Sequence, residues 1–286
     1  MRYRHFLMAI RTTPAQWAAI PLALLALCGC PDDDHVVPDL TGVTVQTLEY
    51  GRGYVAGGEA TSPLYADLYA AMDTAPDELV VVIHGGGFEE GSRAAREIVW
   101  LSANIARAGY AALAIDYRLA GDAPPAPDDW SVDLLRAMHA ASVDLLQALR
   151  WAAAQGYARV FVAGESAGGI AAVQTCAAPA DFLQDRADLP GLNTGAPADV
   201  AALVVLWGGA GLAEIGPGMP PVRIVHGTED NTFGASSLDA WSLNRRLESA
   251  GVECDLVWLD DWDHGAWIAE TDYGDISAVT LDWFAH

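Results

Sequence analysis

Ser166 lies in the stretch AGESAGG at 163–169, directly after the apolar residues Val160–Ala163. A G-x-S-x-G pattern alone is a weak signal in a chain that contains 28 glycines. Here an apolar run precedes the pattern and a segment rich in alanine and glycine follows it. That is the setting of a sharp strand-to-helix turn that exposes a serine hydroxyl. The alternative is an ordinary strand-to-helix turn, but the pattern favours a serine nucleophile.

A serine hydroxyl is a poor nucleophile at neutral pH, so a neighbouring base must take its proton. Three of the seven histidines follow apolar runs, namely His84, His226 and His264. His84 and His226 directly end their runs, where a histidine more often packs or orients a loop. His264 is followed by Gly265 in a loop after the last run. We therefore predict that His264 is the base.

The base needs a carboxylate that fixes its tautomer and stabilises the imidazolium. Asp230 ends the segment HGTED after the preceding apolar run and is our candidate. Glu229 beside it and Glu214 further back remain alternatives. The aspartates within four residues of His264 are too close in sequence to reach round it. With Asp230 as the acid, the chain order is Ser, Asp, His, which is the order of α/β-hydrolases.

A glycine run, HGGGF at 84–88, follows another apolar run. The oxyanion of a tetrahedral intermediate is best stabilised by backbone N–H groups that do not reorganise, and glycines let the main chain approach closely. We predict that the N–H groups of Gly86, Gly87 and Ala167 form an oxyanion hole. The alternative is a flexible glycine turn, which does not explain why the run follows a predicted strand.

Four further residues near these segments are candidate substrate contacts: Phe88, Glu165, Trp207 and Trp267. Three of them are aromatic, and large aromatic side chains at strand ends also commonly pack in the core. The prediction of a substrate contact therefore competes, for each of these aromatic residues, with a place in the core.

Apolar runs and helical spacing alternate along the chain. Runs with strand character occupy 43–50, 64–70, 79–84, 111–116, 159–164, 202–208, 221–227 and 254–260, and apolar residues at helical spacing occupy 94–108, 131–154, 168–177, 238–250 and about 275–284. This alternation predicts an α/β fold, with a mostly parallel, doubly wound sheet of about eight strands and helices on both faces. In such sheets the chemistry lies at the carboxyl ends of the strands, where the candidate residues fall.

The N-terminal residues have the pattern of an export signal. Three arginines precede an apolar run at 20–27 that is too short to span a bilayer. We predict a signal peptide at 1–29 and an acidic tether at 30–42, followed by one catalytic domain at 43–286. Leu27–Cys30 resembles a bacterial lipobox, which would make Cys30 the acylated first residue and the protein extracytoplasmic and membrane-anchored. The alternative is cleavage without lipid, giving a periplasmic or secreted protein.

Composition excludes several classes of partner and chemistry. The net charge is −23, which disfavours nucleic acid and anionic membrane surfaces as partners. All 15 basic residues are arginine, so lysine-dependent mechanisms such as Ser-Lys dyads and Schiff bases are excluded. No cysteine and histidine cluster has the spacing of zinc ligands, and we expect no metal and no cofactor. Cys176 and Cys254 either form a disulfide or remain two free thiols.

Four motifs in order, HGGGF at 84–88, DYRLA at 116–120, GESAGG at 164–169 and HGTED followed by DHG, resemble the α/β-hydrolase esterases. The resemblance covers roughly residues 60–286 and is strongest to the hormone-sensitive-lipase and bacterial feruloyl- and acetyl-esterase-like groups. It implies a triad of Ser166, Asp230 and His264, an oxyanion hole at the glycine run, and a structural role for Asp116–Arg118.

The resemblance also implies the reaction, which is cofactor-free hydrolysis of short-chain carboxylic esters, either small molecules or esters linked to polysaccharide. The N-terminal segment is short and strand-like, whereas the hormone-sensitive-lipase group usually has a helical cap there. A shallow pocket is therefore expected, with any partial lid formed from 179–197 or 208–220. The competing hypotheses are an exopeptidase of the prolyl-oligopeptidase type and a non-catalytic surface lipoprotein with the same fold.

Overall fold

An eight-stranded sheet forms the centre of the protein. The computed structural model describes residues 38–125, 133–178, 195–211, 213–232, 239–265 and 270–285. The strands are β1 (Val43–Val55), β2 (Ala60–Ala71), β3 (Glu78–Ile83), β4 (Ala111–Ile115), β5 (Arg159–Glu165), β6 (Val200–Leu206), β7 (Val222–Gly227) and β8 (Cys254–Leu259), in the spatial order β1-β2-β4-β3-β5-β6-β7-β8. Strands β3 to β8 are parallel, while β1 and β2 pair antiparallel with each other and β2 with β4. The predicted sheet is confirmed.

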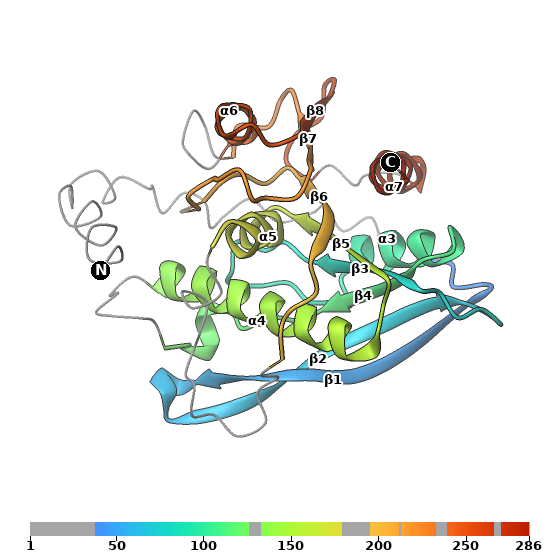
Figure 1. Ribbon diagram of the computed structural model, residues 1–286, viewed down its shortest axis with the longest axis vertical. Coiled ribbons are helices and arrows are strands. Elements are labelled where there is room, and N and C mark those ends of the chain that lie inside the picture. Colours follow the sequence, from blue (N-terminus) through green and yellow to red (C-terminus); the bar gives the residue numbers. More distant parts are fainter. Residues whose placement is uncertain are drawn as a thin grey trace. The chain divides into compact units, whose positions relative to one another are not determined.

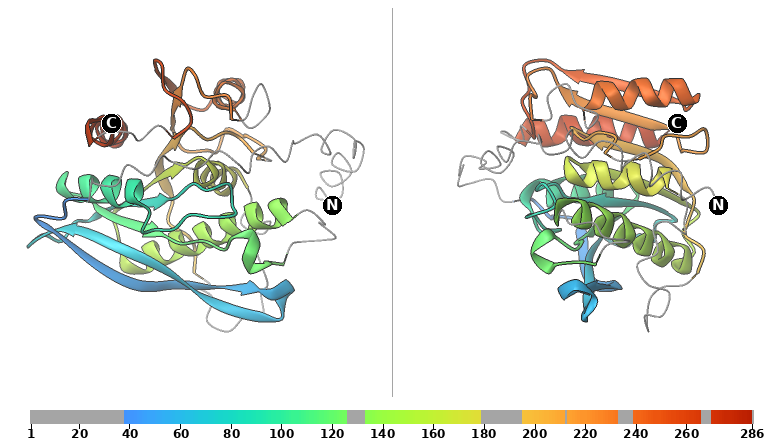
Figure 2. Two further views of the ribbon diagram at one scale, coloured as in Figure 1. Left: turned by 180° about the vertical axis from the view of Figure 1, so that it is seen from behind. Right: turned by 90° about the vertical axis from the view of Figure 1, so that its left-hand side faces the viewer.

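Helices cover both faces of this sheet (Figures 1 and 2). They are α3 (Arg96–Arg107), α4 (Asp133–Gln155), α5 (Ala167–Ala177), α6 (Ala240–Ala250) and α7 (Glu270–Phe284). Helices α3 and α7 pack on one face, and α4, α5 and α6 pack on the other. The five predicted helical segments therefore correspond to the five α-helices of the described residues.

The continuous apolar runs arise because both faces of the central strands are buried. Successive side chains of a strand point to opposite faces. In β3, Leu79, Val81 and Ile83 join the core cluster under α4, α5 and α6, whereas Val80 and Val82 join the cluster under α3 and α7. A strand with both faces buried has no polar position, which is why the periodicity of two is absent from its sequence.

The β1–β2 hairpin is longer than the sequence indicated. The predicted strands ended at residue 50 and began again at residue 64, but pairing continues to Val55 and Ala60. Glycines weaken the strand signal in this stretch, and side chains from other segments occupy the space beside them. A Cβ on Gly51 would lie 2.6 Å from the side-chain oxygen of Gln147, and a Cβ on Gly53 would overlap the Arg118 side chain. Contacts with α4 and with the segment after β4 therefore explain both glycines.

Arg118 and Asp144 form a buried ion pair that joins the segment after β4 to α4. Their side chains are 1% and 0% exposed, and the guanidinium and carboxylate lie 2.8 Å apart. The N–H of Arg118 also donates to Asp144, and its guanidinium donates to the carbonyl of Tyr54 in β1. This pair is the structural role that the resemblance implied for the Asp116–Arg118 segment.

Several predictions concern other parts of the chain. The signal peptide, Cys30 and residues 30–37 of the tether lie outside the described residues. Cys176 and Cys254 are free thiols, so the disulfide alternative is wrong. Burial raises the pKa of Cys176 to about 12, which keeps it protonated. Among the described residues, no helix combines the length and apolar character needed to cross a bilayer.

The buried ion pair gives a test of the fold. Replacing Asp144 by Asn leaves the Arg118 guanidinium buried without its counter-charge, so the free energy of unfolding should fall by about 3–5 kcal/mol. The control is Glu78→Gln, which removes the ion pair between Glu78 and Arg159. The side chain of Glu78 is 29% exposed and that of Arg159 is 47% exposed. That variant should lose only about 0–1 kcal/mol. Equal losses in denaturant unfolding of the two variants would contradict the assigned role.

Candidate active site

A tight turn between β5 and α5 presents Ser166. The serine is the residue before α5, with φ 48° and ψ −114°, a left-handed conformation that is unfavourable for a residue with a side chain. Its N–H donates to the carbonyl of Leu206 at the end of β6, at 2.8 Å. The neighbouring strand therefore holds the turn in this strained conformation.

Two glycines make the turn sterically possible. A Cβ on Gly164 would lie 2.5 Å from the carbonyl oxygen of Gly168, and a Cβ on Gly168 would lie 2.5 Å from the carbonyl oxygens of Ile83 and His84. Real Cβ atoms do not approach backbone so closely. The pattern that drew attention to Ser166 in the sequence therefore has a steric cause, because any side chain at either position would push the turn apart.

The side chains of Ser166, His264 and Asp230 form one chain of hydrogen bonds. The oxygen Oγ of Ser166 lies 2.8 Å from Nε2 of His264, and Nδ1 of His264 lies 2.8 Å from Oδ2 of Asp230. A carboxylate only accepts, so His264 carries its proton on Nδ1 and its Nε2 accepts from the serine hydroxyl. Asp230 has a fully buried side chain, and that of His264 is 10% exposed. The structure brings the three predicted residues together in the predicted order.

Hydrogen bonds between the loops after β7 and β8 set the positions of Asp230 and His264. The N–H of Glu229 donates to the carbonyl of Trp262 at 2.9 Å, and the N–H of Asp261 donates to the hydroxyl of Thr228 at 2.9 Å. The two strands are neighbours in the parallel sheet, so both loops emerge at the same edge. The acid and the base are therefore held by one paired loop structure.

The alternative carboxylates are excluded by position. Glu229 is exposed, and its backbone rather than its carboxylate contacts the loop after β8. Glu214 is also exposed, and its charge faces Arg246 of α6. Of these three carboxylates, only Asp230 contacts His264.

Asp230 is ionised at neutral pH in spite of its burial. Burial opposes ionisation, but the hydrogen bond from His264, the positive charges of His264 and His226 when these rings are protonated, and the N–H of Thr232 at 2.9 Å outweigh it. The pKa of Asp230 therefore lies below its ordinary value. An ionised acid keeps His264 in the Nδ1–H tautomer that the serine requires.

The glycine run lies beside the serine. Gly85 is so close that an added Cβ would lie 3.2 Å from the Cβ of Ser166. Gly86 and Gly87 have φ of 99° and 63°, and the carbonyl of Gly86 accepts from the N–H groups of Glu89 and Glu90. This turn fixes the direction of the loop.

Three amides near the serine have their donors available. Within the described part of the chain, no acceptor pairs with the N–H of Gly86, Gly87 or Ala167. Ala167 is the first residue of α5, where N–H groups have no partner within the helix. The three amides predicted for an oxyanion hole thus have no hydrogen-bond acceptor among the described residues.

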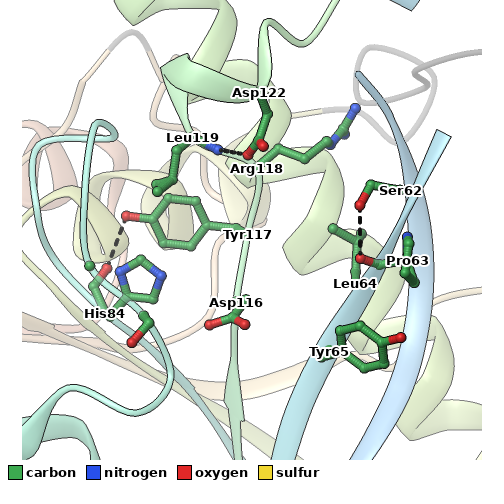
Figure 3. A pocket seen from close by; sticks show the side chains of 12 residues that line it. Ser62, Pro63, Leu64, Tyr65, His84, Asp116, Tyr117, Arg118, Leu119 and Asp122 are labelled. Atoms are coloured by element: carbon green, nitrogen blue, oxygen red, sulfur yellow. Dashed lines mark hydrogen bonds between the residues drawn. The ribbon is translucent and has the colours of Figure 1, made fainter. Parts of the chain in front are cut away.

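His84 and Tyr117 pack together at the start of the glycine loop. The ring of His84 stacks on that of Tyr117, with centroids 4.2 Å apart, and the hydroxyl of Tyr117 donates to the carbonyls of His84 and Gly85. The two rings lie next to each other at a pocket that Ser62–Tyr65 of β2 also line (Figure 3). The pocket has a volume of about 240 Å³. Ser166, Asp230 and His264 do not line this pocket, so it is separate from the hydrogen-bonded chain.

The candidate substrate contacts need correction. Phe88 and Trp207 are 2% and 0% exposed and belong to the hydrophobic core, so they support the site from beneath instead of lining it. Glu165 is also largely buried and accepts a hydrogen bond from the indole N–H of Trp207 at 3.2 Å. Trp267 lies outside the described residues. The sequence could not separate these alternatives because strand-end aromatic residues look alike in either role.

The sequence analysis did not assign His226 to the site. Its Nε2 lies 3.3 Å from Oδ2 of Asp230, the same oxygen that accepts from His264. The only available signal was its place at the end of β7, four residues before the acid. In the described residues, no group of three or more histidine, cysteine or acidic side chains has an arrangement that would hold a metal ion.

Comparisons with known proteins agree with this architecture. A family model described as the α/β-hydrolase fold matches residues 80–215. Esterase 2 of Thermogutta terrifontis, phosphorylated by paraoxon, is 21% identical over 86% of this chain and 94% of that chain, with a TM-score of 0.61. An esterase of the bacterial hormone-sensitive lipase family is 24% identical over 86% and 84%, with a TM-score of 0.59. No curated protein sequence matched the chain. The α/β-hydrolase fold inferred from the motifs is confirmed.

The lowered pKa of Asp230 predicts how stability depends on pH. A carboxylate with a lowered folded pKa contributes stability above the unfolded value, near 3.8, and loses it as the pH falls through the lower folded value. The free energy of unfolding of the wild type minus that of Asp230→Asn should therefore decrease from pH 7 toward pH 2.5.

The control is Glu229→Gln, because the carboxylate of Glu229 is exposed and is not bonded to His264. Its difference from the wild type should stay nearly constant over the same range. A difference for Asp230→Asn that grows on acidification would show that the folded state does not favour the ionised carboxylate.

Proposed function

Because the chain is an α/β-hydrolase in fold, we propose that it is a serine hydrolase that cleaves carboxylic esters through an acyl-enzyme intermediate. The observation that carries the proposal is the continuous hydrogen-bonded chain from Ser166 through His264 to Asp230. It lies beside backbone amides that have no acceptor among the described residues. A nucleophile, its base, the orienting acid and oxyanion donors are the groups that acyl transfer requires.

In the first half of the reaction, Nε2 of His264 takes the proton of Ser166 as Oγ forms a bond to the ester carbonyl carbon. The carbonyl π electrons move to the oxygen, giving a tetrahedral oxyanion. Collapse of this intermediate breaks the bond to the alcohol oxygen, which leaves with the proton from His264. The product is an acyl ester on Ser166 and a free alcohol.

In the second half, His264 removes a proton from a water molecule whose oxygen attacks the acyl carbon. The second tetrahedral intermediate releases the carboxylic acid, and the proton on His264 returns to Oγ of Ser166. Asp230 remains ionised throughout, because its charge stabilises the imidazolium that forms twice in each cycle. No step needs a cofactor.

The backbone amides act on the charge that develops in both intermediates. The N–H groups of Gly86 and Gly87 after β3, with that of Ala167 at the start of α5, would donate to the oxyanion. The first turn of α5 adds the positive end of its dipole at the same place. Because strands and the Gly86 turn fix these amides, little reorganisation is required as the charge forms.

We propose short acyl chains as the substrate class, in small-molecule or polysaccharide-linked esters. Structures of the Thermogutta terrifontis esterase have propionate or butyrate bound, and these are short carboxylic acids. In this chain, Phe88 and Trp207 fill core positions near the site and so do not form an apolar channel wall.

Removing the nucleophile tests the mechanism. Ser166→Ala should lower kcat for p-nitrophenyl acetate by about ten-thousandfold or more while the protein stays folded, since the serine oxygen forms the acyl bond. Circular dichroism and thermal unfolding would verify the fold. Paraoxon should also phosphorylate the wild type on Ser166, seen by mass spectrometry of the peptide, and leave Ser166→Ala unmodified. Retained turnover in the folded variant would remove Ser166 from the role.

A series of p-nitrophenyl esters tests the substrate class. With a shallow site, kcat/KM should be highest for acetate to butyrate and should fall by about tenfold or more at octanoate, because the additional methylenes find no surface to bury. Aminoacyl p-nitroanilides serve as the comparison for amide cleavage. Preference for octanoate would contradict the short-chain proposal, and preference for the anilides would favour the exopeptidase hypothesis.

A further inference from the structure

Asp230 lies close to two imidazoles and is hydrogen-bonded to that of His264. Its Oδ2 lies 2.8 Å from Nδ1 of His264 and 3.3 Å from Nε2 of His226, while its Oδ1 accepts from the N–H of Thr232 at 2.9 Å. The side chains of Asp230 and His226 are 0% and 6% exposed. Water therefore has little access to the carboxylate, and protein groups determine its ionisation and direction.

We propose that His226 is a positioning residue for the acid, with a neutral imidazole that donates from Nε2–H to Oδ2 of Asp230 beside the His264 bond. This inference rests on the proposed function, because it concerns how Asp230 serves His264. Within the described residues His226 does not contact Ser166, and no role in contacting the substrate is assigned to it.

The surroundings of His226 specify its proton. An unprotonated Nε2 would direct a lone pair at the carboxylate, so Nε2 must carry hydrogen. Its Nδ1 is buried and meets no hydrogen-bond partner within the part of the chain that the structure describes. A proton on Nδ1 would thus be a buried donor with no acceptor, which is costly. The neutral Nε2–H tautomer places the single ring proton toward the carboxylate and leaves no proton on the unpaired Nδ1.

The groups that face His226 agree with a neutral ring. Burial lowers its pKa and is the largest effect. The charge of His264 acts in the same direction, and the charges of Asp230 and Asp239, at the start of α6, oppose it. The ring of Trp258 in β8 packs edge-on against the His226 ring, with the ring centroids 5.9 Å apart, and it carries no charge. The result is a lowered pKa and an uncharged donor at neutral pH.

A second donor on the shared oxygen changes how the acid serves the base. When His264 takes the proton of Ser166, that proton must stay on the imidazole so that it can be given to the leaving alcohol. The N–H of His226 lowers the basicity of Oδ2, which keeps Asp230 ionised and the Nδ1 proton on His264. It also prevents the carboxylate from rotating away from His264. His226 therefore sets both the charge and the direction of the acid.

Variants at His226 separate this role from packing. His226→Leu should lower kcat for p-nitrophenyl acetate by about tenfold, the effect of a lost hydrogen bond to a charged group, with little change in KM. The acidic limb of its kcat/KM profile should move to higher pH. Without the His226 donor the Asp230 carboxylate is more basic and stabilises the protonated imidazole of His264 more strongly. His226→Gln can place an amide N–H where Nε2 was and should restore most of both quantities, whereas His226→Asn is too short and should not.

The exposed neighbour variant Glu229→Gln is the matched control and should behave as the wild type. Equal kcat values and unchanged pH profiles for His226→Leu, His226→Gln and the wild type would overturn the proposal. A loss in His226→Leu that His226→Gln does not relieve would indicate packing alone and would also overturn it.

A measurement on the wild type does not depend on activity or on the stability of any variant. In protein labelled with ¹⁵N-histidine, the His226 signals at pH 7 should show hydrogen on Nε2 and none on Nδ1. Hydrogen on Nδ1 would overturn the proposal. If the wild type hydrolyses no ester, the proposed function fails, while this spectrum still decides the hydrogen bond of His226 to Asp230.

Discussion

The close approach of three backbone segments around Ser166 is the constraint on which the site depends. The turn after β5 passes so near the end of β3 and the start of α5 that neither Gly164 nor Gly168 has room for a Cβ. The Ser166 N–H, fixed to the end of β6, then holds the serine at a positive φ. Unfavourable backbone of this kind persists only where the surrounding structure over-determines it. Here adjacent parallel strands do so, because their carboxyl ends meet at one edge.

The same edge explains why distant segments contribute one group each. Strand β3 delivers the glycine loop, β5 the serine, β7 the acid and β8 the histidine, and the register of the parallel sheet aligns their ends. The loops are then joined laterally, as where Glu229 donates to Trp262. Rigid strands with laterally bonded loops give a site whose groups need little reorganisation, which favours stabilisation of developing charge.

Among the described residues, two buried carboxylates have partners close around them. Asp144 has Arg118, and Asp230 has two imidazoles and an amide. The Arg118–Asp144 pair joins the segment after β4 to α4. The groups around Asp230 set the ionisation of a carboxylate close to the nucleophile. In both, burial would penalise the carboxylate strongly if a partner were lost. The remaining acidic residues need no such arrangement where they face water.

Patterns local in the sequence identified most of the fold. The strands β3 to β8 were predicted because burial on both faces gives a continuous apolar run in the sequence. The helices between them were predicted because packing on one side gives apolar residues at helical spacing. The hairpin extension at Gly51–Pro63 was missed because its glycines removed the strand signal. These glycines lie against side chains that are distant in the sequence, Gln147 of α4 and Arg118. Phe88 and Trp207 were misplaced because strand-end aromatic residues have the same signature in the core and at a surface.

The sequence by itself determined the turn at Ser166, the glycine loop and the doubly wound order of elements, because each depends on residues near one another in the chain. Only the tertiary structure decided that Asp230 rather than Glu229 or Glu214 meets His264, and that His226 shares the same carboxylate oxygen. Those outcomes depend on how the loops after β7 and β8 approach each other. Such approach distances are fixed by packing and hydrogen bonds between segments, and no local pattern of residue types encodes them.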